Sequence, residues 1–156
     1  MILSGSYATR YKMSEVRLRA EYAARAINKM MAETGATSVV VHGNSGVSCG
    51  FAALMMTKED FNLVLLRKDN DSSHGAPIEG PDGRRLDKYL ILDDFVSSGA
   101  TMNRIRDKID TLHAQVAWSS PRPECVGIVL YGYHHTKSFE FADGYSVPVL
   151  NRESPE

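Results

Sequence analysis

The sequence predicts a single α/β domain in which a parallel β-sheet is flanked by helices. Short apolar runs, several of them β-branched, alternate with segments whose apolar residues recur every three to four positions. Glycine-rich, basic or acidic residues follow the first three of these runs, at the points where parallel strands would end. The length of 156 residues is usual for one domain with its own hydrophobic core, so we expect residues 1–156 to form one domain.

The first predicted element is a helix over residues 14–35, which begins at a capping serine and carries apolar side chains along one face. The β-branched stretch TSVVV, residues 37–41, then predicts a strand that is buried on both faces. The glycine-rich stretch 42–50 predicts a turn. Residues 51–56, FAALMM, predict a short apolar helix after it.

A second strand is predicted over residues 61–66, and Arg67 and Lys68 follow its end. The next stretch, residues 69–87, is polar and rich in Gly, Pro, Asp and Ser, so we expect a long loop. Loops of this length are uncommon in compact domains and often serve as lids or binding loops.

The remaining predicted elements are a third strand over residues 89–92, a helix over residues 102–116 and a fourth strand over residues 125–133. From His134 onward the chain is aromatic, and we expect it to be irregular.

The composition excludes several classes of protein. Hydrophobic residues make up 43% and charged residues 24%, and the net charge is −1, which is typical of a globular protein without the basic field that nucleic-acid binding requires. The sequence shows no signal-peptide pattern and no long apolar run, so we expect a cytoplasmic protein. Cys49 and Cys125 fit no metal-binding or redox spacing, and we expect two buried thiols.

The stretch YLILDDFVSSGATM, residues 89–102, carries the strongest chemical signal. Its small hydroxyl residues lie where a helix should begin, and helix N-termini expose amide donors that suit a phosphate group. The two adjacent carboxylates, Asp93 and Asp94, instead suit a diol or a divalent cation. Together these groups indicate a sugar phosphate. The alternative is an ordinary strand end followed by a helix cap.

Two common nucleotide-binding motifs are absent. No Gly-Lys-Ser/Thr phosphate loop occurs, and the glycines at positions 43, 46 and 50 do not have the spacing of a dinucleotide-binding fingerprint.

Residues 89–102 resemble the phosphoribosyl pyrophosphate (PRPP) signature of the type I phosphoribosyltransferases. Residues 39–53 resemble the pyrophosphate loop of that family, and residues 63–75 resemble the Arg-Lys that opens its mobile catalytic loop, with a His-Gly similar to that of orotate enzymes. The match extends through residues 79–94 and covers roughly residues 36–133. It implies the type I phosphoribosyltransferase fold, with a small cap built from residues 1–13 and 134–156.

The resemblance implies transfer of ribose 5-phosphate from PRPP to a nitrogen of a base, with release of pyrophosphate and with Mg²⁺ as cofactor. It implies PRPP binding by Asp93, Asp94, Ser97, Ser98, Gly99, Ala100 and Thr101, with the two aspartates also serving Mg²⁺, directly or through water or the ribose hydroxyls. It implies pyrophosphate binding by Asn44, Ser45, Gly46, Arg67 and Lys68. It implies catalytic roles for Arg67, Lys68, His74, Asp93 and Asp94, with His74 in a loop over residues 69–87 that closes as a lid. The alternative for His74 is a solvated loop histidine.

The chain departs from the family at the positions that select the base. The stretch DNDSS lacks the loop lysine of orotate enzymes, and YGYHH lacks their arginine after the fourth strand. Ser97 stands where many hypoxanthine and guanine enzymes have an aspartate. The base therefore stays unidentified. The alternatives are a purine enzyme, or a PRPP- or nucleotide-binding regulator that has lost transfer activity.

Candidates to stack on a base or to pack the core of the cap are Tyr7, Arg10, Tyr11, Tyr131, Tyr133, Phe139 and Phe141. The resemblance also implies a homodimer, in which Arg17, Arg19 or Arg25 reaches the partner's site; the alternative is a solvated helix face. His134 and His135 have no further ligands at a useful spacing, so zinc is not expected.

Overall fold

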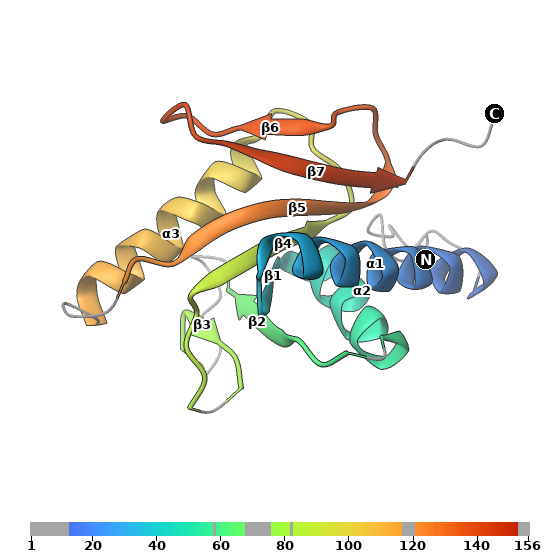
Figure 1. The fold of residues 1–156 in the computed structure, drawn as a ribbon, viewed down its shortest axis with the longest axis horizontal. Coiled ribbons are helices and arrows are strands. Elements are labelled where there is room, and N and C mark those ends of the chain that lie inside the picture. The colour runs from blue at the N-terminus through green and yellow to red at the C-terminus, as the bar shows by residue number, and fades with distance from the viewer. Residues whose placement is uncertain (1–12, 58, 68–75, 82, 117–120, 153–156) are drawn as a thin grey trace, which may run out of the picture.

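The computed structural model describes residues 13–57, 59–67, 76–81, 83–116 and 121–152 (Figure 1). Within them, seven strands form one sheet in the order β3-β2-β1-β4-β5-β7-β6. The strands are β1 (Ser38–His42), β2 (Asn62–Leu66), β3 (Ile78–Glu79), β4 (Lys88–Asp93), β5 (Glu124–Tyr133), β6 (Ser138–Glu140) and β7 (Ser146–Arg152). The five inner strands are parallel, and the short edge strands β3 and β6 are antiparallel to their neighbours. The predicted parallel sheet is confirmed.

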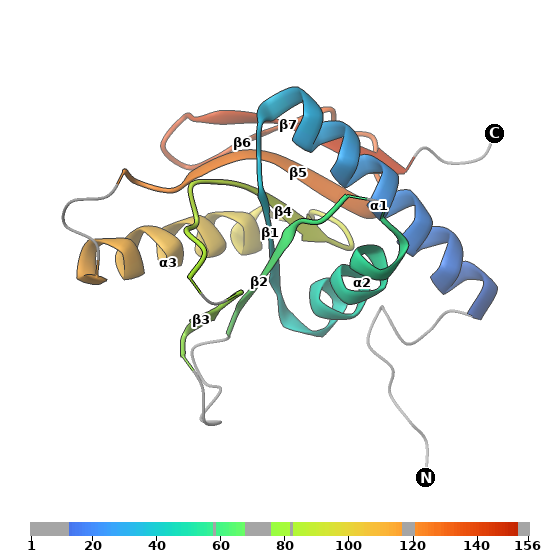
Figure 2. The same ribbon diagram turned by 60° about the horizontal axis from the view of Figure 1, so that its bottom comes forward.

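Three helices cover the two faces of this sheet in the described part of the chain (Figure 2). Helices α1 (Met13–Thr34) and α2 (Gly43–Met56) pack on one face, and α3 (Ala100–Val116) packs on the other. Successive residues of β1 alternate between the faces: Val39 and Val41 join the α1–α2 side, and Val40 joins the α3 side. All five residues of β1 are buried, as its β-branched sequence predicts.

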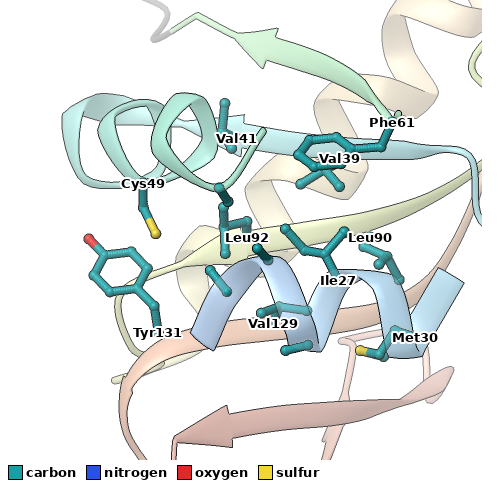
Figure 3. Close-up of a cluster of buried hydrophobic side chains, with 14 of the residues drawn as sticks. Ile27, Met30, Val39, Val41, Cys49, Phe61, Leu90, Leu92, Val129 and Tyr131 are labelled. Carbon is teal, nitrogen blue, oxygen red and sulfur yellow. The ribbon is translucent and has the colours of Figure 1, made fainter. Parts of the chain in front are cut away.

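The core on the α1–α2 side brings Ile27 of α1 against Leu90 and Val129 of the sheet (Figure 3). On the opposite side, α3 contributes Met102, Ile105 and Ile109, which are at most 2% exposed. The predicted helices over residues 14–35 and 102–116 are therefore confirmed to within two residues at each end. None of the helices in the described ranges has the length and apolar character needed to span a bilayer.

Residues 43–50 of the glycine-rich stretch 42–50 are helical and His42 ends β1, so the prediction of a turn there is wrong. Helix α2 begins at Gly43, whose φ of 73° follows the extended His42. The next glycine in this stretch serves packing: a Cβ added at Gly46 would lie 3.0 Å from the backbone oxygen of Leu92. The helix therefore lies close to the sheet, and the glycine is present because no side chain would fit between them.

The C-terminal tail is also more regular than predicted, because residues 134–152 include β6 and β7. Strand β7 pairs with β5, with Ile128 opposite Val149, and β6 pairs with β7, with Phe139 opposite Val147. The β5–β7 pairing joins segments that β6 separates in the sequence, and the local stretch contains Gly144 and Pro148, which obscure the strand pattern.

The described part of the expected cap is thus continuous with the main sheet, while residues 1–12 and 153–156 of that cap lie outside the described residues. Strand β3 likewise occupies part of the predicted loop over residues 69–87.

Candidate functional site

The candidate site lies at the carboxyl edge of the parallel strands. His42 is opposite Leu66 in the β1–β2 pair, and Asp93 is opposite Leu130 in the β4–β5 pair. Parallel pairing therefore places the start of α2, Arg67 and the Asp93–Asp94 pair along one edge of the sheet. His42, which the sequence did not single out, joins two of these strand ends by donating from Nδ1 to the backbone oxygen of Leu66 at 2.9 Å.

Asp93 and Asp94 are nearly buried, with 8% and 9% of their surfaces exposed. The Oδ1 atom of Asp93 accepts a hydrogen bond from the Asp94 amide at 2.9 Å, and Oδ1 of Asp94 accepts one from the Phe95 amide at 2.9 Å. The Gly132 amide donates to the Asp94 carbonyl at 2.8 Å, which ties the pair to β5. Adjacent carboxylates at this depth require hydrogen-bond donors or a cation nearby, and backbone amides supply some of these donors.

The residues after the pair form a small cavity of about 140 Å³, which is lined by residues 93–102. Ser97 and Ser98 are exposed, and α3 begins at Ala100. Gly99 has a φ of 76°, so the chain turns sharply into the helix. The carboxylates, the two serines and the amides at the start of α3 therefore line one cavity of a size that suits a phosphate and part of a sugar.

The start of α2 approaches the carboxylates from the neighbouring strand. The Tyr131 hydroxyl donates to the backbone oxygen of Ser45 at 3.2 Å, which connects α2 with β5. Burial raises the pKa of Tyr131, and the negative charges of Asp94 and Asp93 raise it further, so this phenol stays protonated and remains a donor. The start of α2 thus contacts β5 at Ser45 and lies close to β4 at Gly46, one position before Asp93, and the Asn44 side chain is outside the described part of the structure.

Arg67 already has an acidic partner. Its Nε atom donates to Oε1 of Glu79 at 2.8 Å, and its Nη2 atom lies 2.7 Å from the same oxygen. The Arg67 carbonyl accepts a hydrogen bond from Lys108 Nζ at 2.5 Å, which fixes the strand end against α3. Lys68 and His74, the other predicted residues of this loop, lie outside the described residues.

No protein-family model and no curated protein matches the sequence. Solved structures do share its fold. An orotate phosphoribosyltransferase from Francisella tularensis superposes with a TM-score of 0.61 at 16% identity, over 90% of this chain and 66% of that one. A hypoxanthine-guanine phosphoribosyltransferase from Bacillus anthracis superposes with a TM-score of 0.50 at 11% identity, over 81% of this chain and 71% of that one.

The chain has the type I phosphoribosyltransferase fold. A hypothetical protein from Neisseria gonorrhoeae with bound ppGpp also shares it, with a TM-score of 0.52 at 14% identity over 92% of this chain and 82% of that one. The chain spans slightly less than two thirds of the Francisella enzyme. The likeness establishes the fold, and the residues of the site must indicate the chemistry.

In this phosphoribosyltransferase fold, a basic and aromatic cluster that the sequence did not reveal lies at the end of β5. The Arg19 guanidinium carbon is 5.9 Å from the centre of the Tyr133 ring, and that of Arg152 is 5.0 Å from it. Arg19 is 7% exposed and donates to the backbone oxygen of Tyr131 at 3.1 Å. Arg19 therefore binds the backbone of β5 in its own chain. Arg17 and Arg25 are exposed.

Most aromatic candidates in the described ranges have packing roles in this phosphoribosyltransferase fold. Phe141 is 2% exposed, and its ring packs edge-on against Phe139 with 5.0 Å between the ring centres. Tyr7, Arg10 and Tyr11 lie outside the described residues. Phe95, which the sequence analysis did not propose, is 45% exposed directly beside Asp94. Its position directly after the acidic pair is the feature of the sequence that could have indicated an aromatic side chain at the site.

A cation at this site would have two adjacent carboxylates as protein ligands. The described residues contain no group of three or more His, Cys, Asp and Glu side chains that would form a closed metal site. Mg²⁺ prefers oxygen ligands and usually keeps waters or substrate oxygens, so the Asp93–Asp94 pair fits a cation that arrives with a phosphorylated substrate.

Proposed function

We propose that this chain transfers the ribose 5-phosphate group of PRPP to a nitrogen of a base, which releases pyrophosphate and forms a nucleoside monophosphate. One observation carries the proposal: the nearly buried Asp93–Asp94 pair and residues 97–101 line the same cavity at the end of β4. We call residues 97–101 the phosphate loop. The type I phosphoribosyltransferase fold supports the proposal.

The two halves of the cavity suit the two halves of the sugar phosphate. The amides at the start of α3 and the hydroxyls of Ser97, Ser98 and Thr101 are donors for the 5′-phosphate. The carboxylates of Asp93 and Asp94 accept hydrogen bonds from the vicinal ribose hydroxyls. This division keeps the phosphate away from the negative charges and holds the sugar in one orientation.

Cleavage of the C1–pyrophosphate bond leaves positive charge on the sugar and adds negative charge to the leaving group. Arg67, with Lys68, and the backbone amides of residues 44–46 are the groups that would stabilise the pyrophosphate. Mg²⁺, held by Asp93 and Asp94 through water or the ribose hydroxyls, would supply charge neutralisation at the leaving group. The loop that contains His74 would exclude water from the reactive sugar.

Two kinds of nucleobase are candidates to accept the ribose 5-phosphate: an acid similar to orotate, and a purine. Phe95 offers an exposed ring next to the sugar-binding carboxylates, which suits stacking on a planar base. Ser97 is exposed in the phosphate loop and has no carboxylate to accept a purine proton. Another group must therefore accept the proton of the nucleophilic nitrogen, unless the nucleobase binds as an anion and has no such proton.

A second candidate function is a PRPP- or nucleotide-binding regulator. Glu79 holds the Arg67 guanidinium, which would otherwise meet the leaving group. The sequence DNDSS also lacks the loop lysine. A Neisseria gonorrhoeae protein of this fold carries bound ppGpp. These observations favour ligand binding without transfer.

Release of pyrophosphate decides between the two functions. The protein is incubated with PRPP, Mg²⁺ and, separately, orotate, uracil, adenine, guanine, hypoxanthine or xanthine. We expect release of pyrophosphate with at least one base, together with formation of the matching nucleotide. Binding of PRPP by calorimetry without release with any base would contradict the transferase and support the regulator.

A double substitution tests whether the acidic pair binds the sugar. Asp93→Asn with Asp94→Asn keeps the side-chain size and removes both charges. Each charge-assisted hydrogen bond is worth roughly 1.5–3 kcal/mol. We therefore expect the affinity for Mg²⁺–PRPP to fall on the order of a hundredfold or more, as measured by calorimetry.

The matched control is Glu59→Gln with Asp60→Asn, which removes an exposed pair of adjacent acids just before β2. The control should bind PRPP as the unmodified protein does. Inorganic phosphate should bind the Asp93/Asp94 variant as well as before, because it needs only the phosphate loop. A folded double variant with normal affinity for PRPP would refute the sugar-phosphate assignment.

A further inference from the structure

His134 connects the C-terminal hairpin to the backbone that leads into the phosphate loop. We call residues 134–152 the C-terminal hairpin. The Nε2 atom of His134 lies 2.9 Å from the backbone oxygen of Val96, and its Nδ1 atom lies 3.1 Å from the backbone nitrogen of Thr136. A carbonyl only accepts and an amide only donates, so Nε2 carries the proton and Nδ1 is the acceptor. The two contacts therefore require the neutral Nε2–H tautomer of His134.

Asn103 makes the corresponding connection at the other end of the same backbone. Its Nδ2 atom donates to the Gly99 oxygen at 3.1 Å, and its Oδ1 atom accepts from the Ala142 amide at 2.8 Å. One turn further along α3, Arg106 donates to both carboxylate oxygens of Asp143 at 2.7 and 2.8 Å. The C-terminal hairpin is thus joined to α3 by hydrogen bonds at two successive positions.

The backbone between these anchors packs only at its ends, where Val96 contacts the α3-side core and Gly99 is buried, whereas Ser97 and Ser98 are exposed. The cavity of about 140 Å³ lies on its ligand side. A second cavity of about 220 Å³, lined by Val96–Gly99 and by hairpin residues that include His134 and Phe139, lies on its other side. Between the cavities, the Phe139 ring contacts the chain at Gly99, where an added Cβ would lie 2.8 Å from the ring. The anchors therefore determine the position of residues 96–99 more than continuous packing does.

We propose that His134 and Asn103 are positioning residues, which hold the two ends of residues 96–99 in the conformation that binds phosphate. The identity of the ligand rests on the proposed function, whereas the anchoring itself does not. Neither residue is placed to line the ligand-side cavity. Backbone amides bind an anion best when they are already oriented, because a loop that must be ordered on binding loses part of the binding free energy. On this proposal, the C-terminal hairpin is a support for the phosphate loop as well as an extension of the sheet.

Two variants with matched controls test the proposal. His134→Phe keeps a ring of similar size and removes both hydrogen bonds, and His135→Phe makes the same change at the exposed neighbouring position. Asn103→Ala removes the second anchor with a good helix former, and Arg104→Ala is its exposed control on the same helix. The readouts are amide hydrogen exchange of residues 96–101 in the ligand-free protein and the affinity for inorganic phosphate by calorimetry.

We expect faster exchange at residues 96–101 and about tenfold weaker phosphate binding in His134→Phe and in Asn103→Ala, with both controls unchanged. A tenfold loss corresponds to about 1.4 kcal/mol. Long-range ¹H–¹⁵N NMR spectra should show His134 as the Nε2–H tautomer. Unchanged hydrogen exchange at residues 96–101 in both variants would overturn the proposal. The proposal would also fail if both variants lost stability as whole proteins but bound phosphate as tightly as the unmodified protein. If the unmodified protein binds no phosphate, the proposed function fails, and the exchange measurement alone decides the anchoring role.

Discussion

At the scale of single residues, the partner of a charged side chain decides what chemistry it can perform. Arg67 lies at the strand end that the sequence predicts, but its guanidinium contacts Glu79 of β3. The side chains of Arg67 and Glu79 are 25% and 36% exposed, so solvent screens the pair and its net strength is modest. A pyrophosphate with several negative charges can therefore compete with Glu79 for Arg67.

Glu79→Gln should consequently strengthen the binding of pyrophosphate. A part-exposed ion pair contributes up to about 1 kcal/mol, so we expect a gain of roughly threefold to fivefold in affinity, measured by calorimetry with Mg²⁺ present. Asp87→Asn is the control, because Asp87 pairs with Arg85 at 3.3 Å in an exposed position of the same segment. If Glu79→Gln binds pyrophosphate as the control does, Arg67 does not take part in binding the leaving group.

At the scale of elements, the turn into α3 depends on one glycine and on a ring from another part of the chain. Gly99 combines a φ of 76° with the contact to Phe139, whereas Gly144 has a φ of 83° and open space where a Cβ would lie. The two glycines therefore separate the cost of backbone conformation from the cost of steric overlap.

Gly144→Ala should lower the free energy of unfolding by about 1–2 kcal/mol, which is the cost of a left-handed conformation for a residue with a Cβ. Gly99→Ala should lower it by a further 1–3 kcal/mol, because the Phe139 ring or the loop must move. Chemical denaturation measures both values. Equal losses in the two variants would show that Phe139 gives way easily and does not support the loop.

At the scale of the whole molecule, the sheet is covered on both faces, and each face buries one of the two cysteines. Cys49 belongs to the α1–α2 core and Cys125 to the α3 core, and both are free thiols. The prediction of two buried thiols is confirmed. Burial raises the pKa of each thiol from 9.0 to about 12.

Both thiols should therefore react slowly with a thiol reagent at pH 8 in the folded protein and rapidly after unfolding in guanidinium. Their folded pKa values lie above the unfolded value, so their contribution to stability is complete below about pH 9. It declines as the pH rises from about 9 to about 12. Denaturation measured across this range should show the decline. Rapid reaction of either thiol in the folded protein would show that its side of the core opens readily.

Much of the fold could be predicted because its signals are local. Periodicity and residue order within a short stretch are enough to predict helix α1 and the buried strands β1 and β4. The same holds for the acidic pair and the small hydroxyl residues that follow it. Parallel strands also end at one edge, so the placement of Arg67, residues 44–46 and Asp93–Asp94 along that edge follows from the predicted topology.

The remaining features required the tertiary structure because they depend on residues that are far apart in the chain. Strand β7 acquires its identity by pairing with β5, and His134 reaches Val96 across 38 positions. The pairing of Arg67 with Glu79 likewise depends on where β3 adds to the sheet. The sequence by itself determined the α/β architecture and the composition of the candidate phosphate site, since both are written in local patterns. Only the tertiary structure decided which side chains contact that site from other elements, because contacts between residues far apart in the chain leave no periodic pattern in the sequence.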